Sequence, residues 1–180
     1  MDKKEKALLA VNALREKYPD SICSLNADNP LQLIIATRLS AQCTDARVNM
    51  VTPALFARVP DIESFAMAEV SEVEEYIKSC GLYKTKAADI VSMCQMLRDK
   101  YNSEVPDTIE ELVKLPGVGR KTANLIVGDL YGKPAIVCDT HVIRLSGRLG
   151  LTDGTKDALS VEKHLSALLP PDALITLTAC

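Results

Sequence analysis

The chain has 180 residues, of which 47% are hydrophobic and 25% charged, and its formal net charge is −3. This length suits one large domain or two small lobes, either of which buries enough surface to fold without disulfide staples. The N-terminus lacks the apolar core of a signal peptide, and no stretch approaches the ~20 apolar residues of a membrane span, so we expect neither secretion nor a membrane partner.

The six cysteines are widely scattered, and none forms a CxxC pair. This spacing favours neither a zinc site nor a disulfide framework. We therefore expect no metal ligands and interpret the cysteines as reduced thiols of a cytoplasmic protein.

Alanine and leucine dominate the sequence, and strand-like alternation is scarce, so we predict an all-α fold. Residues 3–17 form the first expected helix. Asn29 is a typical cap for a second helix, which begins at Pro30 and is apolar nearly all round, as in a central helix. A third helix follows the pair Thr44-Asp45, and Pro53 is expected to kink or shorten it.

In the middle of the chain, residues 60–68 are expected to form a short helix or turn. Ser71 and Glu74 resemble a capping box for the next helix, which Gly81 would end. A long amphipathic helix should follow over residues 84–101.

The remaining sequence predicts short helices separated by tight connections. Residues 135–138 are expected to form an extended link into Asp139, a residue type that suits a helix N-cap. The expected helices cover residues 108–115, 120–131, 140–150 and 158–169.

The stretch LPGVGRKTAN, residues 115–124, has three interpretations. A nucleotide phosphate loop is excluded because Arg120 separates Gly119 from Lys121 and because the preceding segment is helical. An inert turn between helices remains possible. A helix-hairpin-helix would use Gly117 and Gly119 for a tight hairpin, and the N-terminus of the following helix would bind a DNA phosphate without reading sequence.

Charge is unevenly distributed along the chain. Residues 60–80 contain six acidic residues and one lysine, whereas residues 114–148 contain six basic residues and two aspartates. We interpret the second segment as a locally basic, DNA-facing surface, although a solvated charge pattern competes with this reading.

Four motifs in this order resemble the endonuclease III family of DNA glycosylases. They are PLQLIIATRLSAQCTDARVN, EEYIKSCGLYKTKAADI, LPGVGRKTAN and VCDTHVIRLSGRLG, and the resemblance spans residues 30 to about 170. It implies removal of oxidised pyrimidines from double-stranded DNA, followed by strand cleavage at the abasic site.

The resemblance also implies the catalytic pair. Lys121 would attack the sugar C1′, expel the base and form a Schiff base that undergoes β-elimination. Asp139 would help to deprotonate the lysine and stabilise positive charge on the sugar. A purely structural role for Asp139 as a helix cap is compatible with this chemistry.

Further residues are expected to contact DNA. Gln42 would fill the space of the extruded nucleotide, Leu82 would wedge into the opposite strand, and His141 would touch the backbone. Each has a structural alternative: Gln42 as a polar helix residue, Leu82 as a core residue, and His141 as a packed or solvent-facing side chain. Arg120 would add a backbone contact, or be an ordinary exposed helix arginine. The full set implied is Gln42, Leu82, Gly117, Gly119, Arg120 and His141.

The family fold has two lobes, here a six-helix lobe over 24–133 and a second lobe over 1–23 and 134–180. Relatives continue into a loop whose four cysteines hold a [4Fe–4S] cluster, so we expect a chain truncated before that loop, an incomplete second lobe and no cluster. Cys180 matches at best one ligand. We expect a monomer at the prokaryotic nucleoid; a non-catalytic DNA-binding module and an inactive fragment are the alternatives.

Overall fold

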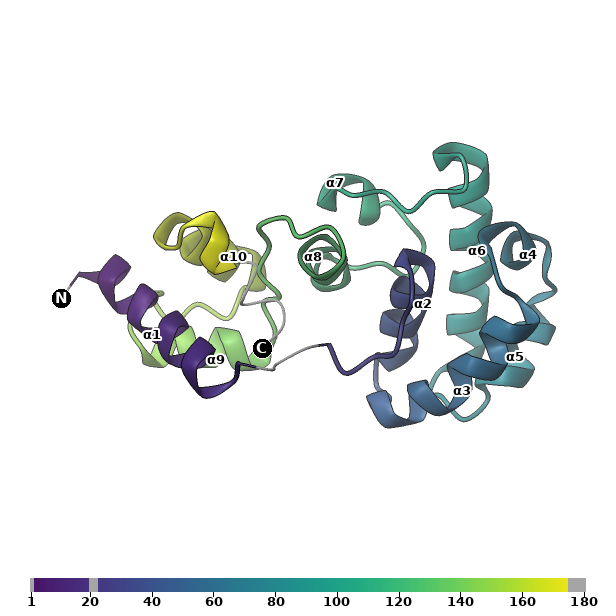
Figure 1. The fold of residues 1–180 in the computed structure, drawn as a ribbon, viewed down its shortest axis with the longest axis horizontal. Helices are drawn as coiled ribbons and strands as arrows, with labels where there is room; N and C mark the ends of the chain where they lie inside the picture. The colour runs from purple at the N-terminus through teal and green to yellow at the C-terminus, as the bar shows by residue number, and fades with distance from the viewer. Residues whose placement is uncertain (1, 20–22, 175–180) are drawn as a thin grey trace. The chain divides into compact units, whose positions relative to one another are not determined.

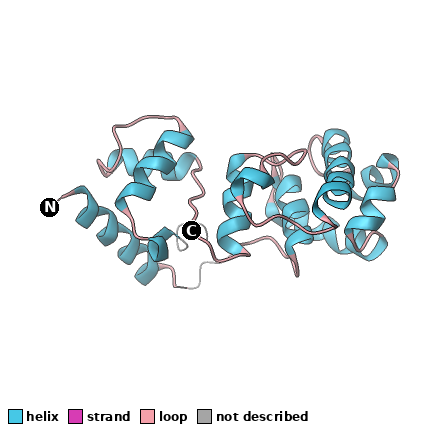
Figure 2. Ribbon diagram, turned by 90° about the horizontal axis from the view of Figure 1, so that it is seen from above, coloured by secondary structure: helices cyan, strands magenta, loops and turns pink. Residues whose placement is uncertain are grey.

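The computed structural model describes residues 2–19 and 23–174, and these residues form helices and no strand (Figures 1 and 2). The predicted all-α class is confirmed for this part of the chain. The helices are α1 (Lys3–Lys17), α2 (Pro30–Ser40), α3 (Asp45–Arg58), α4 (Ile62–Met67), α5 (Val70–Ile77), α6 (Tyr83–Tyr101), α7 (Ile109–Leu112), α8 (Arg120–Asp129), α9 (Thr140–Arg148) and α10 (Ala158–Leu168).

The chain divides into two compact units. Unit 1 combines residues 1–23 with 124–180, and unit 2 spans residues 24–123. The boundary falls within α8, ten residues before the lobe end at residue 133 that the sequence predicts.

Unit 2 is built around α6, which packs against α2, α4 and α5 (Figure 1). The buried positions of α6 recur at helical spacing, and α2 buries six of its eleven residues, as expected for a central helix. Asn29 caps α2 by accepting a 3.0 Å hydrogen bond from the Gln32 N–H. The largest core side chains of this unit include Ile34, Ile35, Leu39, Leu55, Phe65, Ile77, Ile90, Met93 and Leu97.

Two local expectations in unit 2, a capping box from Ser71 and a shortening of the third helix at Pro53, are wrong. The capping box from Ser71 does not form, because α5 begins at Val70 and its N-cap, Glu69, makes no side-chain capping bond. Burial of Val73 and Ile77 sets the start of α5, and tertiary packing thereby overrides the local cap signal. Pro53 does not shorten α3, which continues to Arg58 with the exposed Pro53 inside it.

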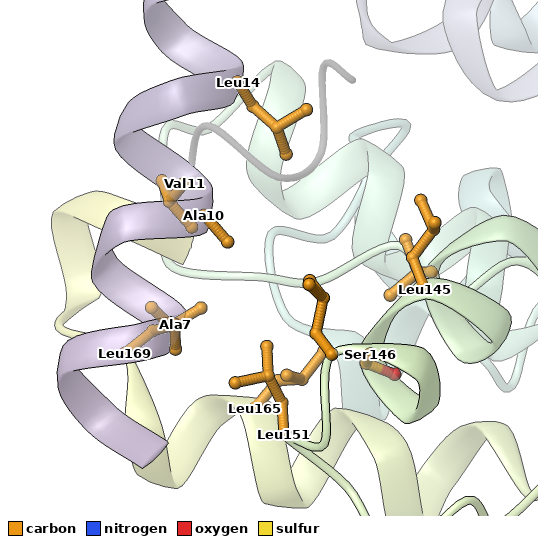
Figure 3. A pocket seen from close by; sticks show the side chains of 11 residues that line it. Ala7, Ala10, Val11, Leu14, Leu145, Ser146, Leu151, Leu165 and Leu169 are labelled. Atoms are coloured by element: carbon orange, nitrogen blue, oxygen red, sulfur yellow. The ribbon is translucent and has the colours of Figure 1, made fainter. Parts of the chain in front are cut away.

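Unit 1 places α1, α9 and α10 around their own apolar core. The link over residues 135–138 is buried, and its Ile136 and Cys138 join the core with residues of α1 and α10. An apolar pocket opens between α1, α9 and α10, and Figure 3 shows Leu14, Leu145 and Leu165 at its wall. Among the described helices of both units, none is long and apolar enough to cross a membrane.

Candidate active site

The hairpin predicted for residues 115–124 is present. Leu115 and Val118 are buried, and the Val118 N–H donates to the Leu115 carbonyl at 3.1 Å. Gly117 has a φ of +74°, which a residue with a side chain rarely adopts. The Gly119 carbonyl accepts from Ala123 N–H at 2.9 Å and so begins α8. A short helix, a glycine turn and a second helix follow one another as in a helix-hairpin-helix.

The two cations after the hairpin stand in the first turn of α8. Arg120 is its first residue and Lys121 its second, and both side chains are exposed. The first N–H groups of a helix lack intrahelical partners, and the helix dipole adds positive character there. This end of α8 therefore suits a phosphate, and Lys121 is accessible to a substrate beside it.

The loops that carry Gln42 and Leu82 lie side by side in unit 2. A Cβ added at Gly81 would lie 3.2 Å from the Gln42 carbonyl oxygen, so the two backbones are in contact. Both Gln42, at φ +55°, and Leu82, at φ +58°, have the left-handed conformation that side chains disfavour. Leu82 is 60% exposed, which contradicts its alternative as a core residue.

These two loops and the hairpin meet at the C-terminal end of α2. Gln42 follows α2 directly, Gly81 contacts Gln42, and Gly117 packs against Arg38 in the last turn of α2. Three loop tips that are far apart in sequence thus share one end of one buried helix. Backbone strain and an exposed apolar tip at one place are typical of a binding surface.

Two residues beneath these loops, Arg38 and Lys86, were not among those predicted from the sequence. Arg38 donates from Nε and Nη2 to Asp89 Oδ2, at 2.9 and 2.5 Å, and so ties α2 to α6. Lys86 is fully buried and donates from Nζ to the Leu39 carbonyl at 2.7 Å. Burial lowers the pKa of Lys86. The signal for Arg38 was present in the sequence, because it is the only charge in the apolar run from Leu31 to Ala41.

Two thiols lie close to each other beside the Gln42 and Leu82 loops. Burial, together with the neighbouring Cys43 thiol and its hydrogen bond, raises the pKa of Cys80 to about 11. At neutral pH the Cys80 side chain is therefore a protonated, weakly reactive thiol.

Asp139 and His141 occupy the first turn of α9 in unit 1. Asp139 is the N-cap, and its Oδ1 accepts from the N–H groups of His141 and Val142 at 2.9 and 2.8 Å. Both capping bonds end on Oδ1, so the cap does not require Oδ2. His141 is exposed, and its Nδ1 lies 3.2 Å from Arg144 Nη2, which rules out a packed core role.

The two catalytic candidates belong to different units: Lys121 lies in unit 2 and Asp139 in unit 1. The buried link that contains Ile136 and Cys138 fixes Asp139 to the core of unit 1, while Leu115 and Val118 fix the hairpin before Lys121 to unit 2.

The cysteines of the described residues do not fit an iron–sulfur cluster. Such a cluster needs four thiolates at one site. Cys94 is buried in α6 and Cys138 in the core of unit 1, and no three metal-ligating side chains form a group among the described residues. Cys180, the one possible counterpart of a cluster ligand, lies outside the described residues.

Comparison with known proteins identifies relatives over most of the chain. A family model described as "HhH-GPD superfamily base excision DNA repair protein" matches residues 35–171. Endonuclease III of Synechocystis sp. is 47% identical over 172 residues, which cover 94% of this chain and 78% of that protein. Endonuclease III of Escherichia coli K12 is 38% identical over 169 residues, 94% of this chain and 80% of that protein.

Solved structures agree with this assignment. A trapped endonuclease III–DNA covalent intermediate matches with a TM-score of 0.91 and 44% identity, over 99% of this chain and 84% of the matched chain. A thermostable thymine-DNA glycosylase shares the fold at a TM-score of 0.81 and 20% identity, over 96% and 84% of the two chains. The chain therefore belongs to the endonuclease III family of the HhH-GPD superfamily, and it is a base excision repair DNA glycosylase.

Proposed function

We propose that this glycosylase removes oxidised pyrimidines from double-stranded DNA and then cleaves the strand at the abasic site through a lysine Schiff base. The observation that carries the proposal is the exposed Lys121 in the first turn of α8, directly after the hairpin glycines. The chemistry of a relative 44% identical supports it, since that protein was trapped as a covalent intermediate with DNA.

The roles of the residues follow from this chemistry. The hairpin holds a DNA phosphate, which brings the neighbouring sugar to Lys121. The Lys121 amine attacks C1′, the C1′–base bond breaks, and the Schiff base then loses the 3′ phosphate by β-elimination. Asp139 accepts a proton from the lysine and stabilises the positive charge that develops on the sugar.

The other proposed contacts hold DNA in the reactive conformation. An extruded nucleotide leaves a gap in the stack, at a cost of a few kcal/mol. Gln42 fills this gap and Leu82 wedges into the opposite strand, while Arg120 and His141 contact the backbone. We propose a monomer that acts on chromosomal DNA without an iron–sulfur cluster among residues 1–180.

The first prediction concerns Lys121→Ala. Borohydride reduces a Schiff base to a stable amine, so the parent chain should become covalently bound to a duplex that contains one abasic site. Lys121→Ala should give no adduct because it lacks the nucleophile, and its affinity for undamaged duplex should change little. Denaturing gel electrophoresis of the borohydride-treated mixtures measures the amount of adduct that each chain forms.

Lys100→Ala is the matched control, because Lys100 is an exposed lysine in the last turn of α6 and lies outside the basic segment of residues 114–148. It should form the adduct like the parent. An adduct with Lys121→Ala would assign the nucleophile elsewhere. No adduct from a parent chain that is folded and binds DNA would indicate a binding module without lyase activity.

A further inference from the structure

The ion pair between Arg38 and Asp89 lies directly beneath the hairpin. Two guanidinium nitrogens donate to one carboxylate oxygen, and the side chains are 17% and 26% exposed. Arg38 is in the last turn of α2, and Asp89 is in the second turn of α6. The pair thus connects the two central helices of unit 2 at the end where the three loop tips meet.

Gly117 rests on this pair without any space between them. A Cβ at Gly117 would lie 2.7 Å from Arg38 Nε, 2.9 Å from Arg38 Cδ and 3.0 Å from Asp89 Cβ. These distances are shorter than van der Waals contact, so the hairpin backbone lies against the ion pair itself. Gly119, two residues later, has no atom within 4 Å of its own Cβ position. One hairpin glycine therefore faces the protein, and the other faces open space.

We propose that Arg38 and Asp89 are positioning residues, and that their ion pair sets the position of the hairpin at which it binds a DNA phosphate. The inference rests on the proposed function, in which the hairpin contacts DNA. Leu115 and Val118 anchor the two sides of the hairpin with buried side chains, whereas Gly117 between them has none, so the surface beneath Gly117 determines where the backbone of the turn lies. Phosphate hydrogen bonds are lost when the N–H groups of that backbone shift by a fraction of an ångström.

The charges of the pair support positioning over direct DNA contact. Asp89 Oδ2 accepts from both Nε and Nη2 of Arg38, so the side edge of the guanidinium is occupied within the protein. A carboxylate at this place also repels a phosphate.

The two roles predict opposite effects for Asp89→Ala, which keeps the Cβ beside Gly117 and removes the carboxylate. A direct contact by Arg38 would strengthen, because a negative charge is lost. A positioning pair predicts weaker binding, because the freed arginine no longer supports the hairpin. We expect the Kd for a duplex with a tetrahydrofuran abasic analogue to rise about tenfold, the effect of one lost charge-assisted hydrogen bond. Fluorescence anisotropy measures this Kd.

Two conservative variants and one control complete the set. Asp89→Asn retains an acceptor, so its Kd should stay within about twofold of the parent value. Arg38→Lys keeps the positive charge but cannot donate from two nitrogens to one carboxylate, so it should bind as weakly as Asp89→Ala. Arg58→Met removes another ion pair of unit 2, in which Arg58 contacts Glu72 at 2.6 Å between α3 and α5, and should bind like the parent.

Kinetics separate positioning from general damage to the fold. The hairpin contact is made equally in the bound substrate and the transition state, so Asp89→Ala should raise KM about tenfold while kcat at saturating DNA changes by less than about threefold. Equal or tighter binding by Asp89→Ala would overturn the proposal, and so would parent-like binding by Arg38→Lys. If the circular dichroism spectrum of Asp89→Ala shows that this variant is not folded like the parent, the DNA affinity of Arg38→Lys tests the proposal instead. Failure of the parent itself to bind or become trapped would refute the proposed function instead.

Discussion

Gly117 and Gly119 are two residues apart and have opposite surroundings. Gly117 combines a φ of +74° with a Cβ position that is already occupied by Arg38 and Asp89. Gly119 has neither constraint. The first glycine is required by the fold, and we infer that the second is required by the DNA backbone that approaches it.

The second prediction separates these requirements. Gly117→Ala should lower the free energy of unfolding by about 2 kcal/mol, because the methyl group both clashes and sits in a left-handed residue. Gly119→Ala should change stability by less than about 0.5 kcal/mol yet weaken DNA binding about tenfold, since its methyl group projects toward the phosphate. Urea denaturation and anisotropy measure the two quantities; equal destabilisation by both would contradict the assignment.

The third prediction distinguishes the two roles of Asp139. Asn has an oxygen that can accept the same bonds from His141 and Val142, so Asp139→Asn should keep stability within about 0.5 kcal/mol. Its trapping rate should nevertheless fall about a hundredfold or more, because an amide cannot accept the lysine proton. In Asp139→Ala the trapping rate should fall to the same extent, and the free energy of unfolding should also fall by about 1 kcal/mol. Normal trapping by Asp139→Asn would show that Asp139 is a cap only.

At the scale of whole elements, most helix starts could be predicted because their caps act locally. Asn29, Thr44 and Asp139 each accept a bond from an N–H two or three residues later, so the sequence around them contains the whole interaction. The start of α5 could not be predicted this way. There, burial of Val73 and Ile77 stabilises the helix more than a local cap would, and the capping box expected from Ser71 does not form.

Helix α6 provides the fourth prediction, which concerns pH. Burial raises the pKa of Cys94 from 9.0 to about 12. The unfolded chain therefore ionises this thiol at a lower pH than the folded chain, so the stability from its protonated form is complete below pH 9 and is lost as pH rises toward 12. The free energy of unfolding should fall there, with a contribution of up to about 1.4 kcal/mol per pH unit from Cys94.

Urea denaturation at several alkaline pH values measures this slope. Cys94→Ala should show a shallower slope than the parent, although a small cavity lowers its stability at every pH. Val91→Ala is the matched control, because Val91 is a buried, non-titrating residue of the same helix. It should lose stability equally at every pH. The same slope in Cys94→Ala and the parent would contradict the assigned shift.

At the scale of the whole molecule, the net charge of −3 is the sum of an acidic segment and a basic segment that lie apart in the sequence. All six basic residues of 114–148 are exposed or half-buried, and they include Arg120, Lys121 and Arg144. The acidic stretch over residues 60–80 belongs to α4, α5 and their connections. Each unit of this acidic protein thus presents basic side chains at its own surface.

The fifth prediction follows from that surface. Phosphate contacts release counterions, so the logarithm of Kd should rise linearly with the logarithm of salt concentration. Two contacts already predict about a tenfold loss of affinity between about 50 mM and about 200 mM salt. Anisotropy titrations on undamaged duplex measure this slope, and an affinity that does not change with salt would contradict phosphate binding.

The sequence by itself determined the helical class, most of the helix starts, the hairpin and its exposed lysine. Each of these depends on residues within a few positions of one another, so the interaction is contained in the local sequence. The tertiary structure alone decided that Gly117 lies on the Arg38–Asp89 pair and that Gln42 contacts the loop of Leu82. These arrangements depend on which helices pack together, because residues 38, 89 and 117 meet only when α2 and α6 form one core.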